Sequence, residues 1–167
     1  VLDHLLTIYA DGYTPVDDTF MTTGKIDPVK DTPMDFTVAT PIGQRIEDTT
    51  FVQLKNGKGY DHNWVLNAKG DVTQVAATVV SPVTGIQLDV YTSEPGLQVY
   101  TGNFLDGTMT GKKGIDYNKC SAICLESQKY PDSPNKPDWP SSYLKPGENT
   151  PAAVSISSRR TCDTNIL

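Results

Sequence analysis

The sequence is poor in histidine and arginine. It contains two histidines among 167 residues, which leaves a histidine-rich metal site without support, and we expect no bound metal. Its three arginines are few for a site that clamps phosphate or carboxylate groups, where bidentate arginine is favoured. The net charge of −6 argues against nucleic acid as a partner, because nucleic-acid-binding domains usually carry a basic patch.

Long hydrophobic runs and common catalytic motifs are also missing. No stretch approaches the ~20 apolar residues that a membrane-spanning helix needs, so we expect no membrane partner. The sequence has no P-loop, no C-x-x-C, no H-E-x-x-H and no G-x-S-x-G motif. These absences exclude the commonest signatures of nucleotide-binding proteins, zinc proteases and serine hydrolases.

The three cysteines are an odd number, which does not suggest a disulfide framework. Cys120 and Cys124 lie in a strand-like run, where four residues span roughly 13 Å, too far for a disulfide. Together with Cys162, they are most simply interpreted as free, mostly buried thiols in a reducing compartment. We therefore expect a cytoplasmic location, although the chain does not begin with Met.

Strand signals dominate the chain and helical periodicity is nearly absent. The runs at 74–80 and 85–92 should form a hairpin, and in the second run Ile86, Leu88 and Val90 should face the core. Glycine and proline separate the short strands, which favours a single all-β domain of the sandwich type. Other strand-like runs lie at 5–10, 97–105 and 119–128. Two long segments, 12–36 and 130–148, should be ordered loops packed by their aromatic side chains.

A carboxylate closes the run at 119–128. Side chains alternate between the two faces of a strand, so Glu126 and Gln128 share a face with small residues, whereas Ile123 and Leu125 share the other. Small residues leave a volume, and Glu126 would line its end. Burial raises the pKa of a carboxylate toward the range that suits a general base. The simpler interpretation, which the local pattern favours, is a strand-end glutamate that reaches solvent.

Polar groups and an aromatic ring occur together in the stretch 59–66. Asp61 and Asn63 could bind sugar hydroxyls, and Trp64 could stack on the C–H face of a sugar ring. The alternative is a strand start with polar residues at its edge. The adjacent His62 is more simply explained as a hydrogen-bonded structural residue than as a ligand.

A glutamine lies in the middle of the run 97–105. Gln98 would point inward there, which is unusual for a strand. Backbone groups could satisfy its amide, or it could contact a bound ligand, and the local pattern leaves both interpretations open.

Three stretches carry these residues in order along the chain: GYDHNWVL, TSEPGLQVYTGNFLDGT and CLESQKYPDSPNKPDWPS. Taken together, in this order and spacing, they resemble the aldose 1-epimerases, or galactose mutarotases. The opening LDHLLTIYADGYTPVD and the segment TGKIDPVKDTPMDF fit the same family. The resemblance covers residues 1–148, as the C-terminal half of the family domain, and leaves 149–167 as a divergent tail. It implies an antiparallel β-supersandwich, here an incomplete part of it.

The resemblance also implies a reaction. The family interconverts the α and β anomers of hexoses such as galactose and glucose by acid/base ring opening, without a cofactor. It assigns the base to Glu126, hydroxyl binding to Asp61, and a further sugar contact to Gln98. The acid histidine of the family belongs to a motif upstream of Val1, so we expect this chain alone to be inactive. The N-terminal half of the fold is then an expected partner, beside the monosaccharide substrate.

Three alternatives remain open at this stage. The chain could be a non-catalytic carbohydrate-binding or sugar-sensing protein on the same fold. A sugar-phosphate epimerase is less favoured because arginine is scarce. A glycoside hydrolase would need two carboxylates facing one bond, a role for which Asp61 and Glu126 are the available pair.

Overall fold

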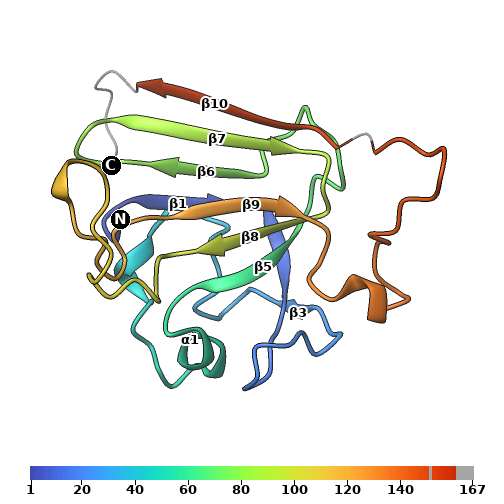
Figure 1. Cartoon of the computed structure of the whole chain (residues 1–167), viewed down its shortest axis with the longest axis horizontal. Helices are drawn as coiled ribbons and strands as arrows, with labels where there is room; N and C mark the ends of the chain where they lie inside the picture. The colour runs from blue at the N-terminus through green and yellow to red at the C-terminus, as the bar shows by residue number, and fades with distance from the viewer. Residues whose placement is uncertain (151, 161–167) are drawn as a thin grey trace.

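Two antiparallel sheets build the molecule, in a computed structural model that describes residues 1–150 and 152–160 (Figure 1). The first sheet has the order β10 (Val154–Arg160), β7 (Ile86–Thr92), β6 (Ala77–Val80), β1 (Leu5–Ile8) and β4 (Thr40–Pro41). The second has the order β3 (Asp27–Pro28), β2 (Ala10–Thr14), β5 (Asp61–Leu66), β8 (Gly96–Tyr100) and β9 (Cys124–Gln128). The all-β, antiparallel prediction is therefore confirmed.

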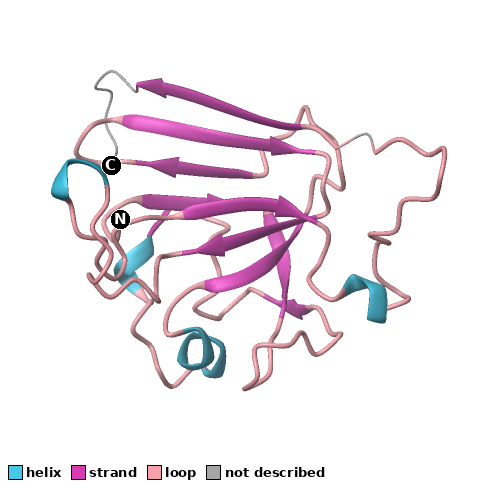
Figure 2. Ribbon diagram, viewed as in Figure 1, coloured by secondary structure: helices cyan, strands magenta, loops and turns pink. Residues whose placement is uncertain are grey.

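Helical structure is confined to short pieces at the periphery of the sheets (Figure 2). In the described part of the chain these are α1 (Val52–Gly57) and three 3-10 turns, η1 (Ile42–Gln44), η2 (Lys112–Gly114) and η3 (Ser133–Asn135). No helix in 1–150 or 152–160 has the length and apolar character that crossing a membrane requires.

The predicted hairpin is formed by β6 and β7, which pair from Ala77 opposite Val90 to Val80 opposite Gln87. The predicted alternation of faces along β7 is only partly correct. Val90 is buried, but Ile86 is exposed at the strand end and Asp89 is buried. Asp89 tolerates burial because Thr78 and Gln87 donate hydrogen bonds to its carboxylate.

The core lies between the two sheets. The first sheet contributes Leu6 and Ile8 of β1 and Val79 of β6, and the second contributes Trp64 of β5 and Leu97 of β8. All of these side chains are buried. Because strand side chains alternate, the residues next to Trp64 and Leu97 in sequence point to the other face of the second sheet.

Both long loops contain packed aromatic residues, as predicted, but the second loop is packed only in its first part, because residues 140–148 are exposed and Tyr143 is 73% exposed. Phe36 meets the rings of Tyr60 and Trp64 edge-on in the core, at centroid distances of 5.1 and 6.1 Å. After β9, Tyr130 and Trp139 form an edge-to-face pair 5.4 Å apart. The segment between β9 and β10 extends away from the sheets (Figure 1).

The run at 119–128 is a strand only in its second half. Cys120 has a positive φ of 59° and its amide donates to the carbonyl of Gly102, so the backbone turns before β9 begins at Cys124. Cys120 and Cys124 therefore do not lie on one strand, and the separation expected for them from strand geometry does not hold. Both thiols are free, with Cys120 buried and Cys124 exposed, and Cys162 lies outside the described residues.

The tail contributes a strand to the first sheet. β10 pairs with β7 from Val154 opposite Thr92 to Arg160 opposite Ile86, and all of its residues are exposed. Arg159 anchors it through an ion pair with Asp89, with 3.3 Å between nitrogen and oxygen. The boundary at 148 between a family domain and a tail stays a prediction.

Candidate functional site

One face of the second sheet is polar. The strand register places Thr14 opposite Asn63, Asn63 opposite Gln98, and Gln98 opposite Glu126, which makes one row across β2, β5, β8 and β9. Asp61 lies two residues before Asn63 on β5, so it projects from the same face. The three residues predicted from the sequence, Asp61, Gln98 and Glu126, are thus brought to one face although they come from three separate strands.

Asp61 and Gln98 are in direct contact. The Nε2 of Gln98 donates a hydrogen bond of 2.8 Å to Oδ1 of Asp61. Partial burial raises the pKa of Asp61 above the ordinary value of 3.8, and the hydrogen bond from Gln98 opposes this rise. Gln98 is therefore satisfied by side chains, and the interpretation that backbone groups satisfy it is wrong.

Two further amides extend this contact. The Nε2 of Gln128 donates to Oε1 of Gln98 at 3.2 Å and to Oδ1 of Asn63 at 3.3 Å. Asn63 in turn donates to the hydroxyl of Thr14 at 3.4 Å. The sequence suggested Asn63 as a polar group that could bind a ligand and placed Gln128 on the same face as Glu126, but it did not indicate that the two side chains meet. Their connection depends on the pairing of β5, β8 and β9, which local patterns do not specify.

A pocket of about 220 Å³ opens beside Asp61 and Gln98. Its wall is made by polar residues of β5 and β8 and by parts of both long loops: Thr14, Val16, Phe20, Thr22, Asp61, His62, Asn63, Gln98 and Pro131. The two loops are joined there, because Thr22 donates to the carbonyl of Pro131 at 3.1 Å. The pocket is smaller than a typical small-molecule site of roughly 300–1,000 Å³, so a ligand of that size would extend beyond it along the polar face.

Glu126 lies on the predicted face, next to Gln98 in the row, but it is exposed. The expectation that small side chains enclose a volume around it is wrong, because 119–123 turns away instead of continuing the strand. The side chain of Glu126 makes no hydrogen bond or ion pair with the residues that the structure describes. Its carboxylate is therefore accessible to a ligand lying on the polar face.

His62 and Trp64 point to the core side of β5, which corrects the idea that Trp64 stacks on a sugar. Trp64 is fully buried and donates its indole N–H to the carbonyl of Met34 at 3.1 Å. His62 is 1% exposed, and its Nδ1 accepts the backbone N–H of Asp61 at 3.1 Å. Burial lowers the pKa of His62 to about 4, so the ring is neutral at pH 7. The structural interpretation of His62 agrees with this geometry.

Comparison with known proteins gives a consistent result. Residues 1–157 match the aldose 1-epimerase family. The chain is 43% identical to the galactose mutarotase of Mus musculus over 148 residues, which are 89% of this chain and 41% of that protein. It is 42% identical to the aldose 1-epimerase of Escherichia coli (strain K12) over 151 residues, covering 89% and 42% of the two chains.

A solved structure agrees with these sequence matches. The GalM/aldose epimerase homologue from C. elegans superposes with a TM-score of 0.79 at 29% identity, over 97% of this chain and 47% of that one. This chain therefore spans about two fifths of the length of the curated relatives that it matches. The matched segment includes the polar face with Asp61, Gln98 and Glu126. By sequence and by fold, the chain belongs to the aldose 1-epimerase family.

Proposed function

We propose that this chain carries the base and the sugar-binding groups of an aldose 1-epimerase, which interconverts the α and β anomers of hexoses such as galactose and glucose. The observation that carries the proposal is the alignment of Asp61, Gln98 and Glu126 on one face of the second sheet. The names of its relatives, galactose mutarotase and aldose 1-epimerase, support the same reaction.

Each residue has a role that its surroundings allow. Asp61 and Gln98 hold sugar hydroxyls, because their carboxylate and amide groups are joined in one geometry and border the pocket. Glu126 lies one strand further along the row and takes the proton from the C1 hydroxyl. Loss of that proton, with protonation of the ring oxygen, opens the ring. Rotation about C1–C2 and closure then give the other anomer.

His62 borders the pocket, but it is buried and its ring is neutral at pH 7, so it is a poor donor of a proton to the ring oxygen. We propose that the part of the family fold that this chain does not span supplies the acid. The same part would cover the sugar, since Glu126 is exposed here.

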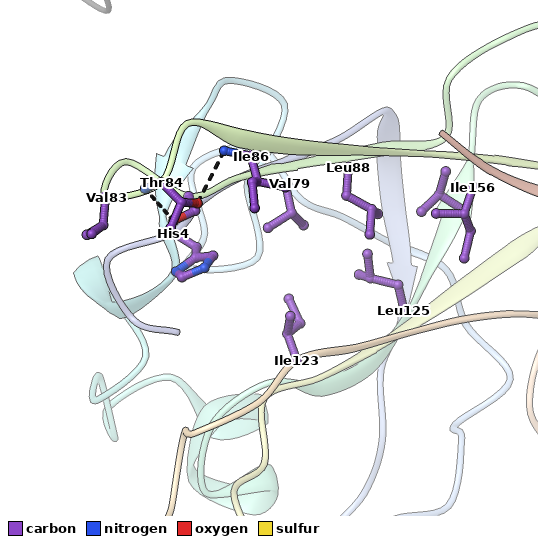
Figure 3. A pocket seen from close by; sticks show the side chains of 11 residues that line it. His4, Val79, Val83, Thr84, Ile86, Leu88, Ile123, Leu125 and Ile156 are labelled. Atoms are coloured by element: carbon purple, nitrogen blue, oxygen red, sulfur yellow. Dashed lines mark hydrogen bonds between the residues drawn. The ribbon is translucent and has the colours of Figure 1, made fainter. Parts of the chain in front are cut away.

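We propose that this part docks at an apolar pocket of about 670 Å³ (Figure 3). Leu88 of β7 and Leu125 of β9 face each other across it, with Ile123 before β9 and Ile156 of β10 along its rim (Figure 3). Ile156 is 62% exposed. The pocket is lined mainly by aliphatic side chains, so strands bearing apolar side chains would suit it. We therefore propose the N-terminal half of the fold as its occupant.

Two assays test these proposals together. The first follows the optical rotation of freshly dissolved α-D-galactose with this chain alone. The second adds the part of the mouse galactose mutarotase that lies outside the matched segment, produced as a separate chain. We expect acceleration over the spontaneous rate only in the second assay, and its loss with Glu126→Gln. Glu47→Gln is the matched control, because Glu47 is an exposed glutamate away from the polar face.

The docking proposal has its own variant. Ile156→Lys places a charge at the rim of the apolar pocket and should weaken the association of the two chains at least tenfold. Val38→Lys, at a position that is 72% exposed, is the control and should leave association unchanged. Self-association of this chain through the pocket, abolished by Ile156→Lys, would instead identify a second copy as the occupant and contradict the proposal.

A non-catalytic sugar-binding protein is the second candidate. It is favoured by one observation, that the histidine beside Asp61 is buried and neutral at pH 7. Galactose binding by NMR titration, without faster anomer exchange in either assay, would support this candidate over the epimerase.

A further inference from the structure

We propose that Gln128 is a positioning residue that orients the amide of Gln98, and through it Asp61, for sugar binding. The proposal rests on the proposed function and adds to it a residue that does not itself touch the substrate. Its basis is the chain of hydrogen bonds that begins at Gln128 and ends at Oδ1 of Asp61.

The direction of these hydrogen bonds carries the argument. A carboxamide has an acceptor end and a donor end, and turning it by half a rotation exchanges them. Gln98 presents its donor end to Asp61, so its acceptor end must face Gln128. If Gln98 turned over, its oxygen would face the Asp61 carboxylate and its NH₂ would face the NH₂ of Gln128. While Gln128 donates, only the orientation in which Gln98 donates to Asp61 leaves both ends of the Gln98 amide paired.

Gln128 is held in turn by Asn63. Its NH₂ group has two protons, and they go to Oε1 of Gln98 and Oδ1 of Asn63, at 3.2 and 3.3 Å. Asn63 is 1% exposed and donates its own NH₂ to the hydroxyl of Thr14. A side chain with both donor protons engaged loses rotational freedom, so Asn63 and Gln98 together hold Gln128 in this orientation.

The absence of a side chain at Gly96 makes this connection possible. Gly96 on β8 lies directly opposite Gln128 on β9, between it and β5. A Cβ at position 96 would collide with Oδ1 of Asn63 and would lie 3.0 Å from the Tyr130 ring. The glycine therefore leaves open the path along which Gln128 reaches Asn63, two strands away.

The consequence for a ligand concerns Asp61. Gln98 is the side-chain donor to Asp61 among the described residues, and it engages Oδ1. With that oxygen held, Oδ2 has a defined direction in which to accept a sugar hydroxyl. Without the hydrogen bond from Gln98, the carboxylate would rotate, and the direction from which Oδ2 accepts a sugar hydroxyl would vary.

The test measures the titration of Asp61 by carboxyl ¹³C NMR in the wild-type chain and in Gln128→Met. Methionine keeps the length of the side chain and removes both donor protons. Because the hydrogen bond from Gln98 lowers the pKa of Asp61, we expect the pKa to rise by about half a unit or more in the variant. Gln44→Met, at an exposed position, is the matched control and should leave the Asp61 titration unchanged. An unchanged Asp61 pKa in a folded Gln128→Met chain overturns the proposal.

A second measurement needs no variant. In the wild-type chain both side-chain amide protons of Gln128 should exchange with water at least tenfold more slowly than those of Gln44, and equal rates would contradict the proposal. Galactose titration then tests the proposed function separately from the positioning role of Gln128. Binding that weakens several-fold in Gln128→Met supports positioning of Asp61 for sugar. Absence of binding by the wild-type chain together with the added part of the mutarotase counts against the proposed function, whereas the role of Gln128 is judged from the Asp61 titration.

Discussion

Glu126 and Gln98 lie directly opposite each other on neighbouring antiparallel strands, yet their surroundings differ. Gln98 is joined by hydrogen bonds to Asp61 and Gln128, whereas Glu126 is exposed and has no such partner among the described residues. One strand of separation therefore divides the polar face into a preorganised part and an open part. In the proposed function, the first part would hold the sugar and the second would receive its C1 hydroxyl.

This division predicts different costs for two substitutions. Glu126→Gln should change the free energy of unfolding by no more than about 0.5 kcal/mol, because an exposed, unpaired side chain adds little to stability. Gln98→Leu should cost about 1–3 kcal/mol, because it leaves the groups of Asp61 and Gln128 without their partner. Urea denaturation measures both values, and a cost above about 1 kcal/mol for Glu126→Gln would show that Glu126 has a structural role.

Asp61 should make the fold less stable as pH rises. Its pKa in the folded chain is raised above 3.8, so the stability it contributes is fully present below that value and is lost as pH rises through the folded pKa. The melting temperature of Asp61→Asn should therefore rise relative to that of the wild type as the pH increases from acidic to neutral. Asp71→Asn should show the reverse trend, because hydrogen bonds from Thr73 lower the pKa of Asp71. A constant difference for Asp61→Asn would contradict the burial of this carboxylate.

His62 should remain neutral well below the pH at which a histidine usually gains its proton. Its folded pKa of about 4 lies below the ordinary 6.5, so its contribution to stability is present above pH 6.5 and is lost as pH falls through the folded value. The ring signals of His62 in a ¹H–¹⁵N NMR titration should stay those of a neutral imidazole with Nε2 protonated down to about pH 5. A midpoint near 6.5 would place His62 in contact with solvent and reopen it as a candidate acid.

In the ion pair that joins β10 to β7, the loss of Asp89 should reduce stability more than the loss of Arg159. The side chain of Asp89 is 3% exposed and accepts from Thr78 and Gln87, whereas that of Arg159 is 61% exposed. Asp89→Ala should thus cost about 1–3 kcal/mol, since it leaves buried donors unpaired. Arg159→Met should cost less than about 1 kcal/mol, as is usual for an exposed ion pair. Thermal unfolding of the two variants checks this order, and equal costs would show that the ion pair holds Asp89.

The sequence by itself determined the fold class, the hairpin of β6 and β7, and the membership of Asp61, Gln98 and Glu126 in family motifs. These features are local, since alternation of side chains and the placing of glycine and proline act within a few residues. The same local rules were insufficient at 119–123, where Cys120 adopts a positive φ and the expected strand is interrupted. They were insufficient also at Asp89, whose burial depends on partners from β6 and β10.

Only the tertiary structure decided which groups meet. The hydrogen bonds that join Asp61 to Gln98 and Gln98 to Gln128 connect residues 37 and 30 positions apart in the sequence, on three strands. The burial of Trp64 and His62 likewise depends on packing between the two sheets. Strand register and burial are set by contacts between distant segments, so a single strand can specify which residues share a face but not what those residues touch.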